Sequence, residues 1–212
     1  MPISLSIREA KSHLRREMRA LRDAISAEER KERSRRIFQK LESLPLFRGA
    51  DTILFYASFG SEVDTWEMME KCRGYGKRIA LPCVEEASGE LMALEVQDFR
   101  RDLYPGYKGI LEPQKMGSRQ VRGEELGLIT VPGLVFDLRG YRLGYGKGFY
   151  DRFLFRLSGK NIPSAGLAFD FQLVEALPVT SEDYSLDLII TEERIIRGEG
   201  AATLPCEGPP LK

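Results

Sequence analysis

The residues most capable of chemistry lie in one segment, Arg142-Leu-Gly-Tyr-Gly-Lys-Gly-Phe-Tyr-Asp151. Its central positions alternate with glycine: Gly144, Gly146 and Gly148. Alternating glycines let the backbone approach a ligand closely and adopt positive φ angles. The loop amides, and the N-terminus of a helix that follows them, direct partial positive charge at an anion. Because Lys147 and Arg142 add full charges and the Asp151 carboxylate can hold Mg²⁺, the simplest use of these parts together is to bind phosphate with magnesium.

Two familiar nucleotide-binding fingerprints do not fit this segment. A Walker A loop places four residues between its glycines and continues with Lys and then Ser or Thr. Counted from Gly140, its second glycine falls on Tyr145, and Gly148 follows the lysine. The dinucleotide fingerprint fails because Phe149 occupies the place of its third glycine. These residues alone therefore leave two interpretations open, a phosphate-binding loop and a glycine-rich turn with Tyr145, Phe149 and Tyr150 in the core.

The histidine and cysteine content limits the kinds of catalysis and metal binding that this chain can support. His13 is the single histidine, so Ser-His-Asp or Cys-His catalysis would have to use it, and a multi-histidine metal site is excluded. Cys72, Cys83 and Cys206 form no C-x-x-C pair, so a disulfide scaffold and a cysteine zinc site are poorly supported. A reducing cytoplasm fits this cysteine content best. Any chemistry must then come from Asp, Glu, Lys, Arg, Tyr and backbone amides.

Charge and hydropathy limit the classes of partner that we expect this chain to bind. The chain carries 32 basic and 32 acidic residues, and this balance removes any global electrostatic reason to bind nucleic acid or an anionic membrane. The N-terminus is charged at Arg8, Glu9 and Lys11 and has no apolar run typical of a signal peptide. No apolar stretch approaches the roughly 18 residues expected of a membrane helix. We expect a cytoplasmic protein with small-molecule partners.

Helical patterns occupy the first part of the chain. A Ser-x-x-Glu capping box at residues 6–9 opens a helix to about residue 23, whose apolar residues recur at helical spacing. A second box at residues 26–29 opens a helix toward residue 44, where Pro45 is a stop signal. The spacing therefore predicts an N-terminal helical pair over about residues 4–44.

Beyond residue 50 the pattern changes to short apolar runs separated by helical segments. Strands are predicted at 52–57, 77–82, 91–96, 128–131, 134–137, 164–169 and 186–191, and helices at 64–73 and 149–157. This alternation predicts an α/β fold with a largely parallel sheet. The stretch 104–122, rich in Gly, Pro and Lys, is predicted to be a long surface loop. Residues 1–197 form one predicted domain, and 198–212 a disordered tail.

A longer stretch of sequence around the glycine-rich segment resembles a known family. It comprises Val131-Pro-Gly-Leu-Val-Phe-Asp137, a two-residue spacer, Gly140-Tyr141 and the segment from Arg142 to Arg152. This pattern resembles the signature of the 5-formyltetrahydrofolate cyclo-ligase (methenyltetrahydrofolate synthetase) family. The resemblance extends from the Lys11-Ser-His-Leu-Arg15 segment to Asp183, and it implies a three-layer α/β sandwich with a mostly parallel sheet, of the ribose-phosphate isomerase and CoA-transferase type.

The resemblance also implies a reaction. In it, 5-formyltetrahydrofolate and ATP give 5,10-methenyltetrahydrofolate, ADP and phosphate, with Mg²⁺ required, so that the enzyme is an ATP-dependent ligase forming a C–N bond. ATP phosphorylates the formyl oxygen, which is otherwise a poor leaving group, and nitrogen 10 then closes the ring. Phosphoryl transfer needs positioning and positive charge more than a side-chain nucleophile, which suits a chain with one histidine. The implied partners are ATP and a folate that can carry polyglutamate, and the implied assembly is a monomer or weak dimer.

Site residues follow from the resemblance by position. ATP is expected on Lys11, Arg15, Arg142, Leu143, Gly144, Tyr145, Gly146, Lys147, Gly148, Phe149 and Tyr150. The chemistry is assigned to Lys147, Arg142 and Tyr150. The folate is expected on Phe59, Asp64, Tyr145, Gly146, Lys147, Gly148 and Phe149. Magnesium is expected on Asp151 and Asp183.

Each of these residues also has a structural interpretation. Lys11 and Arg15 fit a solvated basic helix face, since they are four residues apart. Asp151 fits a first-turn acid favoured by the helix dipole, and Asp183 a turn residue before a strand. Phe59 fits a core position. Asp64 fits a helix N-cap, with Glu67 three residues further on.

The comparison with the family leaves some details of the pocket open. Tyr104, Tyr107 and Glu112 lie in the predicted long loop, where the family has further pocket residues and an aromatic ring could stack on the pterin. Lys147 stands where many bacterial relatives have glycine. Tyr145 replaces an arginine of some members. Lys108 falls near a position where some members have a folate-stacking aromatic.

Two other functions are compatible with a fold of this type. One is a non-catalytic regulator that binds nucleotide or folate, and the other is a sugar-phosphate isomerase. Intact Arg142, Lys147 and Asp151 favour the enzyme over the regulator. An isomerase would need neither Mg²⁺ nor a loop for ATP.

Overall fold

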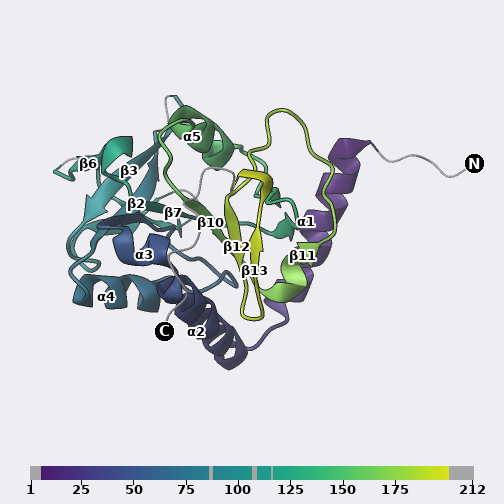
Figure 1. Ribbon diagram of the computed structural model, residues 1–212, viewed down its shortest axis with the longest axis horizontal. Coiled ribbons are helices and arrows are strands. Elements are labelled where there is room, and N and C mark those ends of the chain that lie inside the picture. The colour runs from purple at the N-terminus through teal and green to yellow at the C-terminus, as the bar shows by residue number, and fades with distance from the viewer. Residues whose placement is uncertain (1–5, 86–87, 107–108, 116, 201–212) are drawn as a thin grey trace, which may run out of the picture.

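The computed structural model describes residues 6–85, 88–106, 109–115 and 117–200 and has the predicted α/β architecture. A central sheet is covered on one face by α2 (Ala27–Ser43), α3 (Pro45–Gly49) and α4 (Trp66–Gly74), and on the other by α5 (Phe149–Leu157), as Figure 1 shows. The helix α1 (Ile7–Asp23) lies apart from this sandwich, at its rim (Figure 1). The molecule thus has three layers and one additional helix.

The main sheet has eight strands in the order β13-β12-β10-β7-β1-β2-β3-β6. In chain order these are β1 (Thr52–Leu54), β2 (Arg78–Val84), β3 (Leu91–Val96), β6 (Gln120–Val121), β7 (Leu128–Val131), β10 (Ser164–Leu167), β12 (Leu188–Ile190) and β13 (Ile195–Arg197). The five central strands, from β12 to β2, pair in parallel. The pairs at both edges are antiparallel. The predicted, largely parallel sheet is therefore confirmed at its centre.

Strand β3 is antiparallel to β2, so the unit formed by the strands predicted at 77–82 and 91–96 is a hairpin. The reason is the length of the connection. A parallel pair needs a crossover of a dozen or more residues, and residues 85–90 alone separate these two strands. Glu85 and Glu90 close the hairpin, since the Glu85 amide donates to the Glu90 carbonyl at 2.8 Å.

The segment 104–122, predicted to be a loop, contains three short strands. β4 (Leu103–Pro105) pairs with β5 (Leu111–Pro113) in a separate hairpin, and β6 extends the main sheet. The Gly- and Pro-rich composition conceals these strands because each has at most three residues, too few to show a period. Tyr107 and Lys108 lie outside the described residues.

The two ends of the chain refine the predicted domain limits. The predicted capping box opens α1, because the Glu9 amide donates to Ser6 Oγ at 3.3 Å and the Ser6 amide donates to Glu9 Oε2 at 2.9 Å. At the other end, the Gly198 amide donates to the Asp187 carbonyl at 2.9 Å and the Glu199 amide to the Arg139 carbonyl at 2.8 Å. Residues 198–200 of the predicted tail therefore pack on the domain, and 201–212, with Cys206, lie outside the described residues.

The second predicted helix begins and ends close to its predicted limits. The Glu29 amide donates to Ser26 Oγ at 3.1 Å, but the Glu29 side chain binds Arg33 instead of returning to the cap. Pro45 ends α2 and also begins α3, where a proline at the first position is tolerated because that amide has no partner in a helix.

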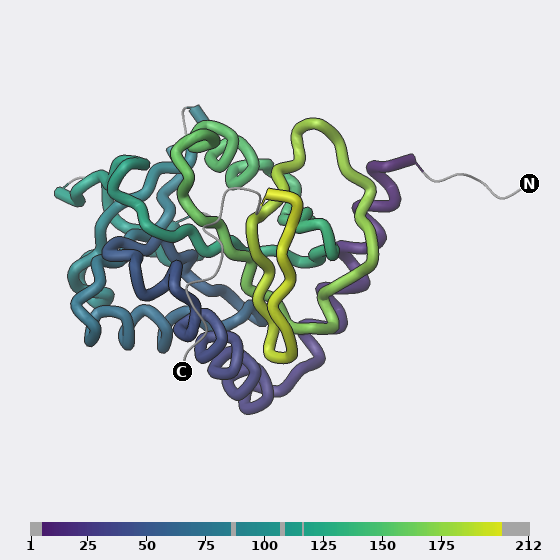
Figure 2. Tube along the Cα trace, viewed as in Figure 1, coloured from purple at the N-terminus to yellow at the C-terminus, as the bar shows by residue number. Residues whose placement is uncertain are grey.

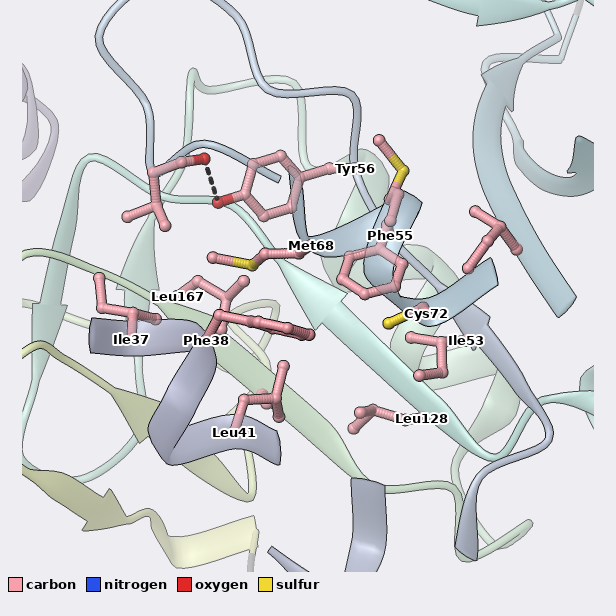
Figure 3. Packing of buried hydrophobic residues seen from close by; sticks show 14 of the residues in the cluster. Ile37, Phe38, Leu41, Ile53, Phe55, Tyr56, Met68, Cys72, Leu128 and Leu167 are labelled. Atoms are coloured by element: carbon pink, nitrogen blue, oxygen red, sulfur yellow. Dashed lines mark hydrogen bonds between the residues drawn. The ribbon is translucent and has the colours of Figure 1, made fainter. Parts of the chain in front are cut away.

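Each face of the sheet has its own core. Ile53 contributes to the cluster beneath α2–α4, where Phe38, Phe55 and Met68 pack together (Figure 3). Its neighbour Leu54 points to the opposite cluster, which α5 closes. Successive residues of a strand face opposite sides, so the two layers of helices bury both faces of β1. Cys72 and Cys83 are free and buried.

A smaller unit holds α1 against the domain. The strand β8 (Val135–Asp137) pairs with β9 (Arg142–Leu143) and with β11 (Leu173–Val174), and Met18 of α1 packs in a third cluster with Leu134 and Val135. The short helices η2 (Gly123–Glu125) and η3 (Asp170–Gln172) complete the described elements. The chain after β11 runs back along α1 (Figure 2), so α1 and residues 180–183 approach each other. Among the described residues, no helix is long and apolar enough to cross a membrane.

Candidate active site

A cleft of about 1360 Å³ opens between α1 and the body of the molecule. It is bordered by the glycine-rich loop, by residues 56–62 after β1, by the end of β2 and by residues 180–183. Ligands of α/β proteins bind at the carboxyl ends of parallel strands, and the segments after β1 and β2 lie there. Single small-molecule pockets are usually about 300–1,000 Å³, so this cleft has room for two substrates.

The glycine-rich loop leads into α5, as the sequence predicted, but its first two residues form the strand β9, which was not predicted. Gly146 has φ +94° and Gly148 has φ +66°, in the left-handed region that favours glycine. Gly148 is also the N-cap of α5 and provides no side chain to cap its first amides. These amides, together with the dipole of α5, direct partial positive charge at the cleft.

One side of the cleft, here called the cationic wall, consists of α1 and this loop. The basic residues of α1 that line the cleft are Arg8, Lys11, Arg15, Arg19 and Arg22. Arg15 Nε donates to the Gly144 carbonyl at 2.7 Å and so ties the helix to the loop. Lys147 is exposed at the loop tip and lines the cleft. The predicted ATP residues of α1 and of the loop are thus brought together, although 120 or more positions separate them in the sequence.

Arg142 and Tyr150 lie deeper in the cleft. Arg142 is 5% exposed, and its guanidinium carbon is 5.9 Å from the centre of the Tyr150 ring. Arg142 Nη1 lies 3.1 Å from Asp151 Oδ1, within ion-pair distance, but makes no hydrogen bond of good geometry, and the buried Tyr150 hydroxyl has no partner in the described structure. Burial raises the pKa of Tyr150, so its hydroxyl stays protonated and can donate. Two buried donors without a hydrogen-bond partner therefore belong to residues that line the cleft.

The two carboxylates predicted to bind magnesium both line the cleft. Asp151 Oδ1 accepts from the Tyr184 amide at 3.1 Å, and Asp183 Oδ2 accepts from Lys11 Nζ at 2.7 Å. Burial opposes ionisation of Asp183, but the hydrogen bonds from Lys11 and Thr180 outweigh it, so the pKa of Asp183 is lowered. No cluster of three or more His, Cys, Asp or Glu side chains within the described part of the chain could hold a metal alone. Two carboxylates suit an ion whose other ligands are water and substrate phosphates, as is usual for Mg²⁺.

A second part of the lining, here called the apolar wall, comes from scattered segments. Its members are Phe59, Pro82, Val84, Leu91, Ile110 and Leu111. Phe59 is 48% exposed and is therefore a surface of the cleft and not a core residue. Glu112 lines the same part of the cleft, and Tyr104 does not reach it.

The structure does not bring Asp64 to the cleft. Asp64 borders a separate shallow depression next to α2 and α4. Its Oδ1 accepts from the Trp66 amide at 2.9 Å, and its own amide donates to Ser34 Oγ at 2.9 Å. Asp64 therefore helps to hold the start of α4, but the N-cap considered for it is wrong, because the N-cap residue is Thr65.

Glu62, two residues earlier, lies in the cleft where Asp64 was expected. It is 7% exposed, and its Oε2 accepts from the Phe59 amide at 3.0 Å. Burial raises the pKa of Glu62, and the charge of Arg22 opposes that shift. Arg22 also lines the cleft, from the last turn of α1. A signal for Arg22 existed in the sequence, because it continues the row of basic residues spaced by three or four from Lys11. The sequence carried no comparable signal for Glu62.

Comparison with known proteins supports the resemblance. The model of the 5-formyltetrahydrofolate cyclo-ligase family matches residues 7–192. The 5-formyltetrahydrofolate cyclo-ligase of Escherichia coli K12 is 32% identical over 180 residues, which cover 84% of this chain and 98% of the relative. A probable 5-formyltetrahydrofolate cyclo-ligase of Caenorhabditis elegans is 31% identical over 200 residues, covering 90% and 97%.

Solved structures resemble the whole described fold. The NMR structure of 5,10-methenyltetrahydrofolate synthetase from Aquifex aeolicus has a TM-score of 0.77 and 34% identity, and the match covers 95% of this chain and 96% of that one. The synthetase from Mycoplasma pneumoniae has a TM-score of 0.69 and 26% identity, with 86% and 98% covered.

Proposed function

The chain belongs to the 5-formyltetrahydrofolate cyclo-ligase family, and from that premise we propose that it converts 5-formyltetrahydrofolate to 5,10-methenyltetrahydrofolate in an ATP- and Mg²⁺-dependent reaction that releases ADP and phosphate. The observation that carries the proposal is a single cleft with two chemically different walls. One wall offers positive charge and free amides, and the other offers apolar surface.

The cationic wall suits the triphosphate of ATP. Lys11 and Arg15 of α1 line the cleft together with the glycine-rich loop, whose Gly144 carbonyl accepts from Arg15, and with Lys147 of that loop. Charge-assisted hydrogen bonds from such groups are about twice as strong as neutral ones. A phosphate chain placed between helix and loop would meet positive charge on both sides.

The apolar wall suits the flat pterin of the folate. Phe59 presents an exposed aromatic ring, and Ile110 and Leu111 provide aliphatic surface. Glu62 adds a carboxylate beside this apolar surface, where it can accept from the N–H groups of the pterin ring. Apolar surface with a few placed polar groups is the usual composition of a small-molecule site.

Magnesium would be held by Asp151 and Asp183 together with phosphate oxygens, and when bound it supplies positive charge that offsets the charge of the phosphates. The paired cations Lys11 and Arg142 lie next to these two carboxylates. A lysine and an arginine released from their carboxylates would become free to contact phosphate.

The residues then act by positioning and by electrostatics. The formyl oxygen attacks the γ-phosphorus of ATP, the bond to the bridging oxygen breaks, and ADP leaves. Nitrogen 10 next attacks the formyl carbon, loses its proton, and the C–O bond breaks to release phosphate. Lys147 and Arg142 stabilise charge on the transferred group, and the protonated Tyr150 hydroxyl donates to an oxygen of the reacting groups.

One assay tests the proposal. The protein is incubated with ATP, Mg²⁺ and 5-formyltetrahydrofolate, and the methenyl chromophore is followed, with ATP left out as the control. Formation of the chromophore only when ATP is present supports the ligase. Binding of ATP or folate without turnover would replace it with the non-catalytic regulator, and sugar-phosphate isomerisation would replace it with the isomerase. The cytoplasmic location, the monomeric or weakly dimeric state and the use of polyglutamylated folate stay predictions.

A further inference from the structure

Arg22, in the last turn of α1, makes three contacts to three different segments of the chain. It is 4% exposed. Its Nε donates to Ser61 Oγ at 3.0 Å, its Nη1 to the Gly133 carbonyl at 3.3 Å and its Nη2 to the Tyr145 hydroxyl at 2.9 Å. A buried guanidinium with this distribution joins α1 to the loop after β1, to the turn after β7 and to the glycine-rich loop.

The direction of the hydrogen bonds beyond Arg22 is fixed by chemistry. An arginine can only donate, so the Tyr145 hydroxyl accepts from it. That hydroxyl has one proton, and it donates this proton to Glu62 Oε1 at 2.9 Å. The other oxygen of Glu62 accepts from the Phe59 amide. Arg22, Tyr145 and Glu62 thus form a one-way chain, here called the Arg22 relay, that ends on a carboxylate of the apolar wall.

Other charged or titratable groups surround the relay, but none replaces Arg22. Asp23 is bound to Ser61 Oγ, and Tyr56 and Tyr150 are buried nearby as neutral hydroxyls. Arg19 lies over the ring of Tyr145 at 5.3 Å from its centre, so it acts on the ring face and not on the hydroxyl. Arg22 is the cation that opposes the effect of burial on Glu62. A buried carboxylate deprived of its counter-charge is costly and takes up a proton more readily.

We propose that Arg22 is a positioning residue for the folate half of the site, which through the Tyr145 hydroxyl fixes the Glu62 carboxylate at the cleft and ties the glycine-rich loop to residues 59–62. This inference rests on the proposed function for the identity of the two substrates. Loss of the relay loosens Glu62 on the apolar wall and leaves Lys11, Arg15 and the loop amides in place. The KM for 5-formyltetrahydrofolate should therefore respond more strongly than the KM for ATP.

Steady-state kinetics of four variants test the inference. Arg22→Met removes the charge and keeps the length of the side chain, and it should raise the KM for the folate about tenfold and the KM for ATP about twofold at most. Arg22→Lys should recover part of the loss, because one ammonium can still reach the hydroxyl. Tyr145→Phe should raise the folate KM about threefold. Arg16→Met, at an exposed position of the same helix that does not line the cleft, is the matched control and should match the wild type.

Coupling within the relay provides a second criterion. If Arg22 acts through Tyr145, Arg22→Met should raise the folate KM by a clearly smaller factor in the Tyr145→Phe background than in the wild type. Multiplicative effects, or equal changes in both KM values, would overturn the inference. If Arg22→Met does not fold, Tyr145→Phe becomes the deciding variant, because its half-exposed side chain loses only a hydroxyl. An unchanged folate KM in that variant would also overturn it.

A measurement without substrate keeps the two proposals separate. The ¹³C resonance of the Glu62 carboxyl is followed through a pH titration of the ligand-free protein, assigned with Glu62→Gln. Arg22→Met should move the midpoint to higher pH, and an unchanged midpoint would contradict the relay. If the wild type forms no methenyl product, the proposed function fails, while this titration still decides whether Arg22 controls Glu62.

Discussion

The two walls of the cleft have different origins in the sequence. The cationic wall is built from one helix and one continuous loop, and its residues are spaced regularly along α1 or follow one another between Arg142 and Asp151. The apolar wall comes from the loop after β1, the end of β2, the start of β3 and residues 110–111. Local sequence therefore specifies where phosphate would bind, whereas the tertiary fold assembles the surface for the second substrate. Variants on each wall should affect different kinetic constants.

The largest effect should come from the cationic wall, at Lys147. Lys147→Ala should lower kcat by about 10²–10³-fold, because it removes a charge directed at the transferred phosphoryl group. The side chain is exposed, so the unfolding midpoint in urea should change little. Lys31→Ala, an exposed lysine of α2 outside the cleft, is the control. Near-wild-type formation of the methenyl product by Lys147→Ala would remove Lys147 from this role.

The next effect concerns magnesium at the edge of the cationic wall. Asp151→Asn should weaken Mg²⁺-dependent ATP binding about tenfold or more in calorimetry, because a carboxylate is a better ligand for Mg²⁺ than an amide. Asp64→Asn is the matched control, since Asp64 lies outside the cleft, and it should leave binding unchanged. A Mg²⁺ titration that is the same in Asp151→Asn and in the wild type would count against the assignment.

A variant of the apolar wall should change the kinetic constant of the other substrate, the folate. Phe59→Ala removes an exposed ring and should raise the KM for 5-formyltetrahydrofolate about tenfold, with little change in the KM for ATP. Tyr104→Ala, an exposed aromatic that does not reach the cleft, should behave as the wild type. A rise in the KM for ATP instead would show that the two walls do not bind separate substrates as proposed.

The smallest effect is on stability and depends on pH. The pKa of Asp183 is lower in the folded protein than its usual value of 3.8, so its pairing with Lys11 stabilises the fold above that pH and is lost as the pH falls through the lowered value. Asp183→Asn should therefore cost about 1 kcal/mol at neutral pH in urea unfolding, and progressively less below pH 3.8. The same cost at every pH would show that the contact is not an ion pair in solution.

The sequence predicted the elements whose signals are local. The capping box at Ser6 and the helix after Gly148 lie where expected, because each depends on residues within one turn of the helix. The edge strands β6 and β13 were missed, and the antiparallel direction of the predicted strand β3 was not assigned. The short connection before β3 is visible in the sequence and indicates a hairpin, whereas the pairing of the two-residue strand β6 is a tertiary property that composition does not encode.

The candidate site shows the same limit at the level of single side chains. Asp64 and Glu62 are two acids in one short loop, and sequence spacing does not say which faces the cleft. The structure places Glu62 there because Tyr145 and the Phe59 amide hold it, whereas Ser34 of α2 holds the backbone of Asp64 at the start of α4. The partners that decide lie 83 residues from Glu62 in one case and 30 from Asp64 in the other.

The central claim is that the two walls bring the formyl oxygen to the γ-phosphorus of ATP. The most direct test uses 5-formyltetrahydrofolate labelled with ¹⁸O in the formyl group, in a reaction with unlabelled ATP and Mg²⁺, and measures the isotope in the released phosphate by mass spectrometry. The account predicts one ¹⁸O atom in each phosphate, because the formyl oxygen leaves bound to the transferred phosphorus. Methenyl product accompanied by unlabelled phosphate would contradict it.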